Sequence, residues 1–105
     1  MAKPFSPVDL DKVIHERARL AIMAALAAGQ GMTFNELKET AGMTDGNLSV
    51  HARVLESARY VSIRKSFVGP KPRTTLSLTA AGRAAFRKYI DQLEQIVAQG
   101  RKKEG

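Results

Sequence analysis

Apolar positions recur at three- and four-residue spacing over the first quarter of the chain. They run from Leu10 to Leu26, acidic residues lie near the start, and Gly29 follows the end. This spacing and these end signals predict a helix over residues 9–28. The preceding residues, 1–8, hold two prolines and are expected to form an extended N-terminal arm.

Two shorter helices separated by a tight turn are predicted next. The stretch "TFNE" is a capping box, in which Thr33 caps a helix over residues 33–41 and the glutamate three residues later reaches back. Gly42 ends this helix, and Thr44 caps the next one, which is expected over residues 44–58. Two helices joined by a turn that contains glycine are typical of a helix-turn-helix motif.

In the rest of the chain, apolar residues first alternate with polar ones and then return to helical spacing. "YVSIRKSFV" and "RTTLSL" alternate apolar with polar residues around "GPKP", which predicts a hairpin over residues 60–78 with a four-residue tip. Thr79 caps a helix expected over residues 79–98, and residues 99–105 are expected to be a frayed tail.

The order of these elements predicts a mostly helical α+β fold in a single domain spanning residues 1–105. Three helices are followed by a two-stranded wing, to which a short third strand can add, and by a long C-terminal helix. This arrangement is a winged helix-turn-helix. Every local signal agrees with it, which strengthens the prediction beyond any one motif.

Positive charge is concentrated in one part of the chain. The net charge is +7, and the whole excess lies in residues 57–90, which contain no Asp or Glu. A field of one sign attracts polyanions, so nucleic acid is favoured as a partner over a generic solubilising role for the charge. The absence of cysteine excludes disulfides, and no apolar stretch is long enough to span a membrane. A cytoplasmic protein with no membrane partner is expected.

The third predicted helix has one apolar face and one small, polar face. Leu48, Ala52 and Leu55 form the apolar face, whereas the opposite face lacks the Glu and Lys pairs typical of solvated helices. Such a face fits the major groove of DNA, where Asn and Arg make bidentate contacts with adenine and guanine. The candidate DNA contacts on this helix are Thr44, Gly46, Asn47, Ser49, Val50, His51 and Arg53. For His51, a partly buried structural role is an equal alternative.

The predicted hairpin supplies four more candidate DNA contacts, namely Arg64, Lys65, Lys71 and Arg73. Lys71 and Arg73 lie at the tip and are placed to reach the minor groove or its flanking phosphates. The two prolines of the tip lower the entropic cost of ordering it on binding. The alternative is a charged hairpin that only prevents edge-to-edge aggregation.

Several motifs together resemble the small winged-helix transcription regulators related to the MarR and ArsR groups. They are "FNELK", "TDGNLS-H---LE", "YV-I-K-F-G-KPRT" and "LT--GR-AF", and the resemblance covers residues 10–97. It implies a homodimer that binds a palindromic operator, usually as a repressor. The third helix would then be the recognition helix and the hairpin the wing.

Three residues near the recognition helix depart from the pattern of that family. Val50 stands where a basic residue is usual, and Ala52 stands where leucine is usual. Arg59 stands where glycine is usual, at a position that takes a left-handed helix cap. A non-glycine residue held in that conformation costs on the order of 1 kcal/mol.

The last predicted helix has a wider apolar stripe than a small domain needs. Its apolar residues step by 4, 3 and 4 positions, which is a heptad-like spacing. Together with the resemblance, this predicts that the first and last helices pack across a two-fold axis. The predicted interface residues are Leu10, Val13, Ile14, Phe86, Tyr89, Ile90, Leu93, Ile96 and Val97. The alternative is that the last helix covers only its own subunit.

Enzymes and cofactor proteins fit the sequence poorly. The chain has no glycine-rich phosphate loop and no nucleophile elbow, and His15 has no clustered ligands for a metal. No enzyme activity, cofactor or metal is therefore expected. A small-molecule effector between the first and last helices is left open, with Met23 and Phe86 as candidates, although core packing is the favoured role of both.

A winged-helix module that binds proteins is the main alternative function. It would need an exposed apolar patch on the third helix or the wing, and Val50 with Val54 is too small a patch. RNA binding would need exposed aromatic residues, most of which lie at core-like positions. Duplex DNA is therefore the preferred partner.

Overall fold

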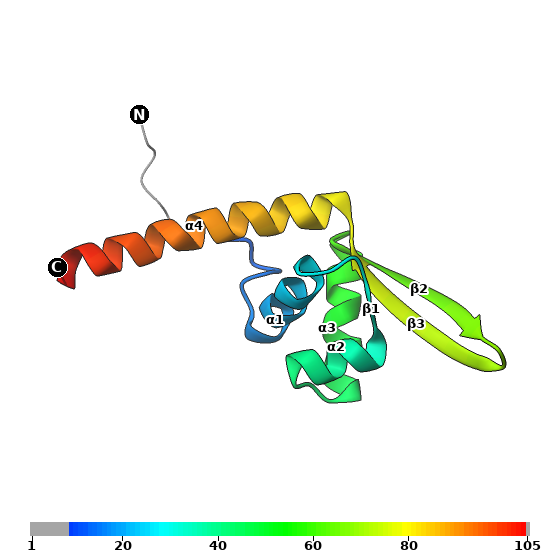
Figure 1. Ribbon diagram of the computed structural model, residues 1–105. Helices are drawn as coiled ribbons and strands as arrows, with labels where there is room; N and C mark the ends of the chain where they lie inside the picture. The colour runs from blue at the N-terminus through cyan, green and yellow to red at the C-terminus, as the bar shows by residue number, and fades with distance from the viewer. Residues whose placement is uncertain (1–8, 105) are drawn as a thin grey trace.

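The computed structural model describes residues 9–104 of the chain and confirms the winged helix-turn-helix fold (Figure 1). The predicted N-terminal arm, 1–8, lies outside the described residues. The elements are α1 (Arg17–Ala27), β1 (Met32–Thr33), α2 (Phe34–Ala41), α3 (Asp45–Ser57), β2 (Val61–Val68), β3 (Lys71–Leu78) and α4 (Ala80–Glu104). The strands form an antiparallel sheet in the order β1-β3-β2, so β1 is the short third strand.

The hydrophobic core lies where α1, α2, α3 and the first half of α4 meet the base of the sheet. Twelve apolar side chains of the described residues are buried there. A Val, Leu, Ile or Met side chain contributes roughly 1.5–3 kcal/mol when it is fully buried. Two parts of the chain extend beyond this core, the tip of the β2–β3 hairpin and the C-terminal half of α4 (Figure 1). No helix within residues 9–104 has the length and apolar character to cross a membrane.

The first helix begins at Arg17, so the prediction of a helix from residue 9 is wrong. A carboxylate oxygen of Asp11 accepts hydrogen bonds from the N–H groups of Val13, at 2.8 Å, and Ile14, at 3.2 Å, which holds this segment in turns. Glu16 then caps α1 by accepting from the N–H of Arg19 at 2.8 Å. The apolar residues before α1 still reach the core, which explains why their spacing looked helical.

The same Asp11 carboxylate ties the N-terminal segment to the base of the wing. It accepts a short hydrogen bond from the hydroxyl of Tyr60, which lies just after α3. This hydrogen bond, helped by burial, raises the pKa of Tyr60 to about 12. The tyrosine therefore stays protonated and keeps donating across the physiological pH range.

The two helices of the helix-turn-helix begin and end as their sequences predict. The capping box is present, because Thr33 accepts from the N–H of Glu36 at 3.1 Å and Glu36 accepts from the N–H of Thr33 at 2.9 Å. Gly42 ends α2 with a φ of 66°. Thr44 caps α3 by accepting from the N–H of Asn47 at 3.1 Å. These side chains fix the angle at which α3 leaves the turn.

The end of α3 confirms that Arg59 occupies a left-handed conformation, with a φ of 68°. Its N–H donates to the carbonyl of Glu56 at 2.9 Å, and the N–H of Tyr60 donates to the carbonyl of Leu55 at 3.0 Å. This pair of bonds is a Schellman motif, in which glycine is the usual residue. The arginine side chain is exposed, so no buried contact compensates for the strain.

Replacing Arg59 with glycine is expected to stabilise the protein by about 1 kcal/mol, because glycine takes this conformation without a steric penalty. Urea unfolding of the variant and the parent measures the difference. Arg64→Gly is the control, because it removes the same charge from an exposed strand position and is expected to destabilise. Equal stability of Arg59→Gly and the parent would mean that the left-handed residue carries no strain.

The hairpin tip and the last helix differ from their predicted bounds. Only Gly69 and Pro70 lie between the strands, because Val68 pairs with Lys71, so the predicted four-residue tip is wrong. The φ of 63° at Gly69 suits the first central position of such a two-residue turn. The last helix continues to Glu104 instead of fraying after residue 98, because Gly100 is flanked by good helix formers.

Candidate nucleic-acid interface

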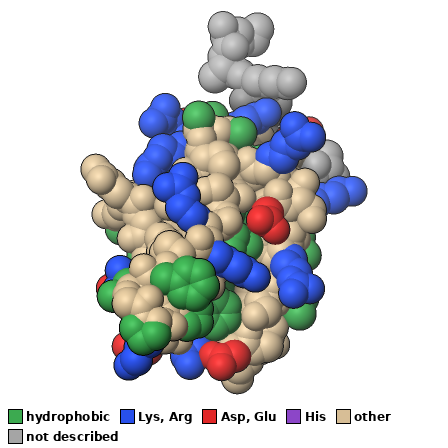
Figure 2. Space-filling model, turned by 90° about the vertical axis from the view of Figure 1, so that its right-hand side faces the viewer, with side chains coloured by type: hydrophobic (Ala, Val, Ile, Leu, Met, Phe, Trp, Pro, Cys, Tyr) green, Lys and Arg blue, Asp and Glu red, His purple; other side chains and the backbone are tan. Residues whose placement is uncertain are grey.

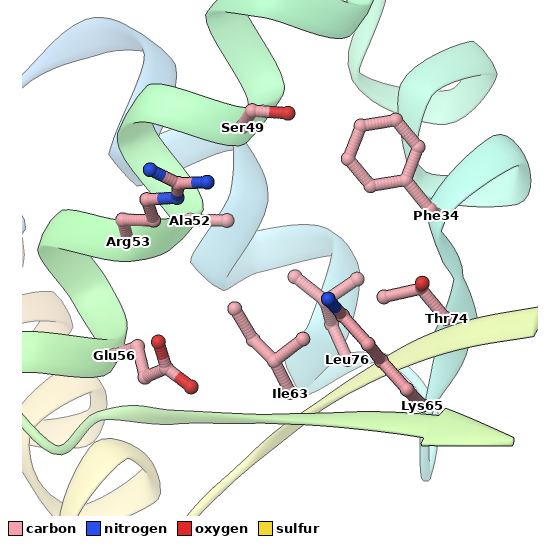
Figure 3. A pocket seen from close by; sticks show the side chains of 9 residues that line it. All are labelled: Phe34, Ser49, Ala52, Arg53, Glu56, Ile63, Lys65, Thr74 and Leu76. Carbon is pink, nitrogen blue, oxygen red and sulfur yellow. The ribbon is translucent and has the colours of Figure 1, made fainter.

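The exposed side of α3 and the wing border one hollow with a volume of about 560 Å³ (Figure 3). Side chains from α2, α3, β2 and β3 point toward one another around it. Its lining residues are Phe34, Ser49, Ala52, Arg53, Glu56, Ile63, Lys65, Thr74 and Leu76. Arg53 on α3 and Lys65 on β2 bring positive charge to it from two sides, whereas Glu56 adds one carboxylate at the end of α3 away from its N-terminus.

The two faces predicted for α3 are confirmed. Leu48, Ala52 and Leu55 are buried in the core. Gly46, Asn47 and Arg53 are exposed and Ser49 is half-buried, while the side chain of Val50 is 59% exposed. An apolar side chain left this open on a helix is suited to contact with a thymine methyl group. Contact of these residues with DNA stays a prediction.

The N-terminus of α3 is fixed by neighbouring side chains. The hydroxyl oxygen of Thr44 accepts from the backbone of α3, so the capping role of this residue is established by geometry. Lys38 approaches Asp45 at 2.9 Å, with the Asp45 side chain exposed and the Lys38 side chain half-buried. A surface pair of this kind contributes no more than about 1 kcal/mol. Its main effect is therefore to orient the first turn of α3.

His51 is held by α1 and turned away from the other predicted contacts. Its Nδ1 lies 3.1 Å from a guanidinium nitrogen of Arg19 and 3.7 Å from a carboxylate oxygen of Glu16. The N–H of Arg19 donates to Glu16 and is the main cause of its lowered pKa, and the charges of His51 and Arg19 act in the same direction. This placement favours the structural alternative for His51. Glu16 and Arg19 position α3, but they lie far from it in the sequence, and no sequence pattern links them to it.

The four basic residues of the wing are exposed, as predicted. Lys65 borders the hollow beside α3, whereas Arg73 borders a second hollow of about 380 Å³ with Asn35 at the start of α2. Figure 2 views the molecule from the side of the wing and shows Lys and Arg side chains spread over most of that face, with few carboxylates. Lys65 therefore brings positive charge to the hollow that Ser49 and Arg53 of α3 also line.

Two apolar side chains near the tip of the wing are exposed, on opposite faces of β2. Phe67 is 73% exposed and Val68 is 50% exposed. The alternation along β2 is as predicted, but the hairpin extends past the helices, so its tip has no core to face (Figure 1). Phe67 is thus an aromatic residue outside the core, contrary to the expectation from its spacing.

The predicted dimer interface divides into buried and accessible residues. Leu10, Ile14 and Tyr89 are buried within their own subunit, so their assignment to an interface is wrong. Tyr89 lies under the N-terminal turns, where its hydroxyl is 2.7 Å from Nδ1 of His15 and burial raises its pKa. The other predicted residues are half-buried, apart from Val97, which is 48% exposed.

The candidate effector residues pack in the core. Met23 is fully buried, and Phe86 packs against the core cluster. A pocket of about 210 Å³ lies instead between α4 and the N-terminal turns. Its lining residues are Asp9, Asp11, Tyr60, Ala85, Lys88, Tyr89 and Gln92. In residues 9–104, no three metal-binding side chains gather closely enough to hold an ion.

Comparison with known proteins places these features in a wider context. Residues 18–97 match the model of a family described as winged helix DNA-binding domain. An uncharacterised protein of Methanocaldococcus jannaschii, MJ0432, is 35% identical over 85 residues, which cover 81% of this chain and 92% of that protein.

Solved structures agree with this family in fold. A transcriptional regulator homologue from Pyrococcus horikoshii OT3 is 26% identical with a TM-score of 0.78, over 83% of this chain and 86% of the other. A putative MarR-family transcriptional regulator from Enterococcus faecalis V583 is 22% identical with a TM-score of 0.77, over 94% and 97%. The second likeness concerns the fold alone.

Proposed function

Because the chain belongs to the family of winged helix DNA-binding domains, we propose that it is a transcriptional regulator that binds double-stranded DNA sequence-specifically through α3 and the wing. One observation carries the proposal. Ser49 and Arg53 on the exposed face of α3 and Lys65 on the wing line the same hollow (Figure 3). The likeness to the Pyrococcus horikoshii regulator supports the regulatory role.

The charges around the hollow orient the DNA. Glu56 repels phosphates from the C-terminal end of α3, whereas Gly46, Asn47 and Val50 lie exposed at the N-terminal end. The N-terminal end of α3 therefore leads into the major groove, with Asn47 directed to base edges and Arg53 reaching them from the second half of the helix. The wing then lies along the adjacent phosphates and minor groove, where Lys71 and Arg73 bind.

A homodimer and a palindromic operator complete the proposal. Val97 on the apolar stripe of α4 is 48% exposed, and the C-terminal half of this helix extends beyond the core, where it is available to a second copy (Figure 1). A two-fold axis through α4 would set two recognition helices about 34 Å apart, one turn of DNA. Repression follows if the bound dimer blocks RNA polymerase.

The described part of the chain also holds a small pocket between α4 and the base of the wing, beside Tyr60 and Tyr89. A molecule bound there would change the angle between α4 and the wing. Its volume of about 210 Å³ is below the roughly 300–1,000 Å³ of typical ligand sites. We therefore assign no ligand to it.

Arg53 and Lys71 are expected to act differently on DNA binding. Arg53→Ala should weaken binding to the preferred duplex by about 1–3 kcal/mol and change random duplex little, because it removes a base contact. Lys71→Ala should weaken both and lower the salt slope by about 1, because it removes a phosphate contact. Fluorescence-anisotropy titrations at several salt concentrations measure both effects.

The matched control is Arg101→Ala, which removes one exposed positive charge at the far end of α4. It is expected to bind both duplexes as the parent does, apart from a small change in long-range attraction. If Arg53→Ala weakened binding to specific and random duplex equally, as Lys71→Ala is expected to, the proposed division between recognition helix and wing would be contradicted.

A further inference from the structure

The exposed phenyl ring near the tip of the wing has no role in the interface described so far. Phe67 is 73% exposed, more than any other large apolar side chain in the described residues. Single exposed apolar side chains are common on proteins, so exposure by itself assigns no function. The direction and surroundings of the ring carry the argument.

Phe67 lies on the face of the hairpin that adjoins the recognition helix. Side chains on a strand alternate, so Phe67 shares its face with Ile63 and Lys65, which border the hollow beside α3. On the facing strand, Leu76 and Thr74 border the same hollow, and the next residue on that face is Pro72, which pairs directly with Phe67. The ring therefore extends the hairpin surface beside α3 toward the tip of the wing.

The distance along the strand places the ring beyond one groove of a duplex. Phe67 is four positions further along the strand than Ile63, which corresponds to about 13 Å at roughly 3.3 Å per residue. The major groove of B-form DNA is about 12 Å wide. With α3 in that groove, Phe67 therefore lies past its phosphate wall, at the minor groove alongside.

The charges around the ring favour a polyanion as its partner. Arg64 and Lys65 precede it on β2, and Lys71 and Arg73 lie opposite on β3, while residues 57–90 hold no carboxylate side chain. Figure 2 shows apolar side chains gathered in the lower part of the wing-side face, with Lys and Arg and a few carboxylates around them. A partner that fits this surface must offer phosphates to the basic side chains and an apolar recess to the ring. The sugar-lined minor groove of DNA offers both.

We propose that Phe67 is an apolar wedge that enters the minor groove beside the site held by α3. Apolar side chains inserted there unstack a base step and bend the duplex, and flexible pyrimidine–purine steps yield at the lowest cost. Phe67 thus adds a sequence preference outside the bases that α3 contacts. The proposal rests on the DNA-binding function proposed above.

The test uses a duplex that the parent protein selects from a random library. Phe67→Ala is expected to bind it about 10-fold more weakly and to lose any preference for a pyrimidine–purine step under the wing. Phe67→Leu should keep part of the affinity. Val68→Ala is the matched control, because it removes an exposed apolar side chain from the opposite face of the same strand, and it should bind within about twofold of the parent.

A second measurement reports on the base step itself. A 2-aminopurine placed under the wing should brighten when the parent binds and should not respond to Phe67→Ala, because an unstacked base fluoresces more. The wedge proposal would be overturned if Phe67→Ala kept the affinity and the base-step preference of the parent. It would also be overturned if Val68→Ala lost as much affinity as Phe67→Ala. Failure of the parent to select any duplex would instead overturn the DNA-binding function. Altered sedimentation of Phe67→Ala with unchanged DNA binding would show that the ring contacts protein.

Discussion

Replacing Gly82 with alanine is expected to destabilise the protein by about 3 kcal/mol or more. Gly82 is buried in the first turn of α4, where a Cβ atom would lie 2.0 Å from the carbonyl oxygen of Tyr60. That backbone cannot yield easily. The Tyr60 N–H is bonded to Leu55, and its carbonyl accepts from the N–H of Thr79 at 3.0 Å.

Urea unfolding of Gly82→Ala and the parent tests this close approach. Gly100→Ala is the matched control, because the same helix holds both glycines and no atom lies within 4 Å of a Cβ built on Gly100. It is expected to stabilise by up to about 1 kcal/mol, through the higher helix propensity of alanine. Equal stability of Gly82→Ala and the parent would contradict the packing of α4 against the base of the wing.

Replacing Val97 with aspartate is expected to abolish the dimer and to weaken operator binding at least about 100-fold. Val97 is 48% exposed and lies on the α4 stripe that extends beyond the core. A carboxylate buried between two copies would be strongly unfavourable, whereas in the free subunit it stays in water. The monomer should therefore keep its fold and lose the second half-site.

Sedimentation analysis and anisotropy with the selected duplex measure the two effects of Val97→Asp. Gln95→Asp serves as control, because it adds the same charge about 200° away around the helix, on an exposed side chain. It is expected to remain dimeric and to bind normally. A parent protein that sediments as a monomer, or a Val97→Asp variant that stays dimeric, would contradict the proposed assembly.

Local signals were sufficient to predict the helix-turn-helix. The capping box, the left-handed Gly42 and the cap at Thr44 each act within a few residues, so their chemistry can be read directly from the sequence. Arranging the residues of α3 around a helix separates core from surface side chains correctly, because this helix is buried on one side only. The left-handed Arg59 was predicted from the resemblance instead, because glycine is usual at that position in the family pattern.

Long-range contacts explain what the sequence did not reveal. The start of α1 is displaced by Asp11, which also bonds Tyr60 49 positions away. The pairing of His51 with Arg19 spans 32 positions, and its residues have no local pattern. The exposure of Phe67 depends on where the sheet extends past the core, and the alternation of apolar and polar residues along the strand does not show this point.

The most direct test of sequence-specific DNA binding is a fluorescence-anisotropy titration of the parent protein. Duplex from the region upstream of its own coding sequence is compared with random duplex of the same length, at two salt concentrations. The proposed function predicts tighter binding to the upstream duplex and a steep fall in affinity with salt, because the wing neutralises phosphates. Equal and weak binding to both duplexes would contradict it.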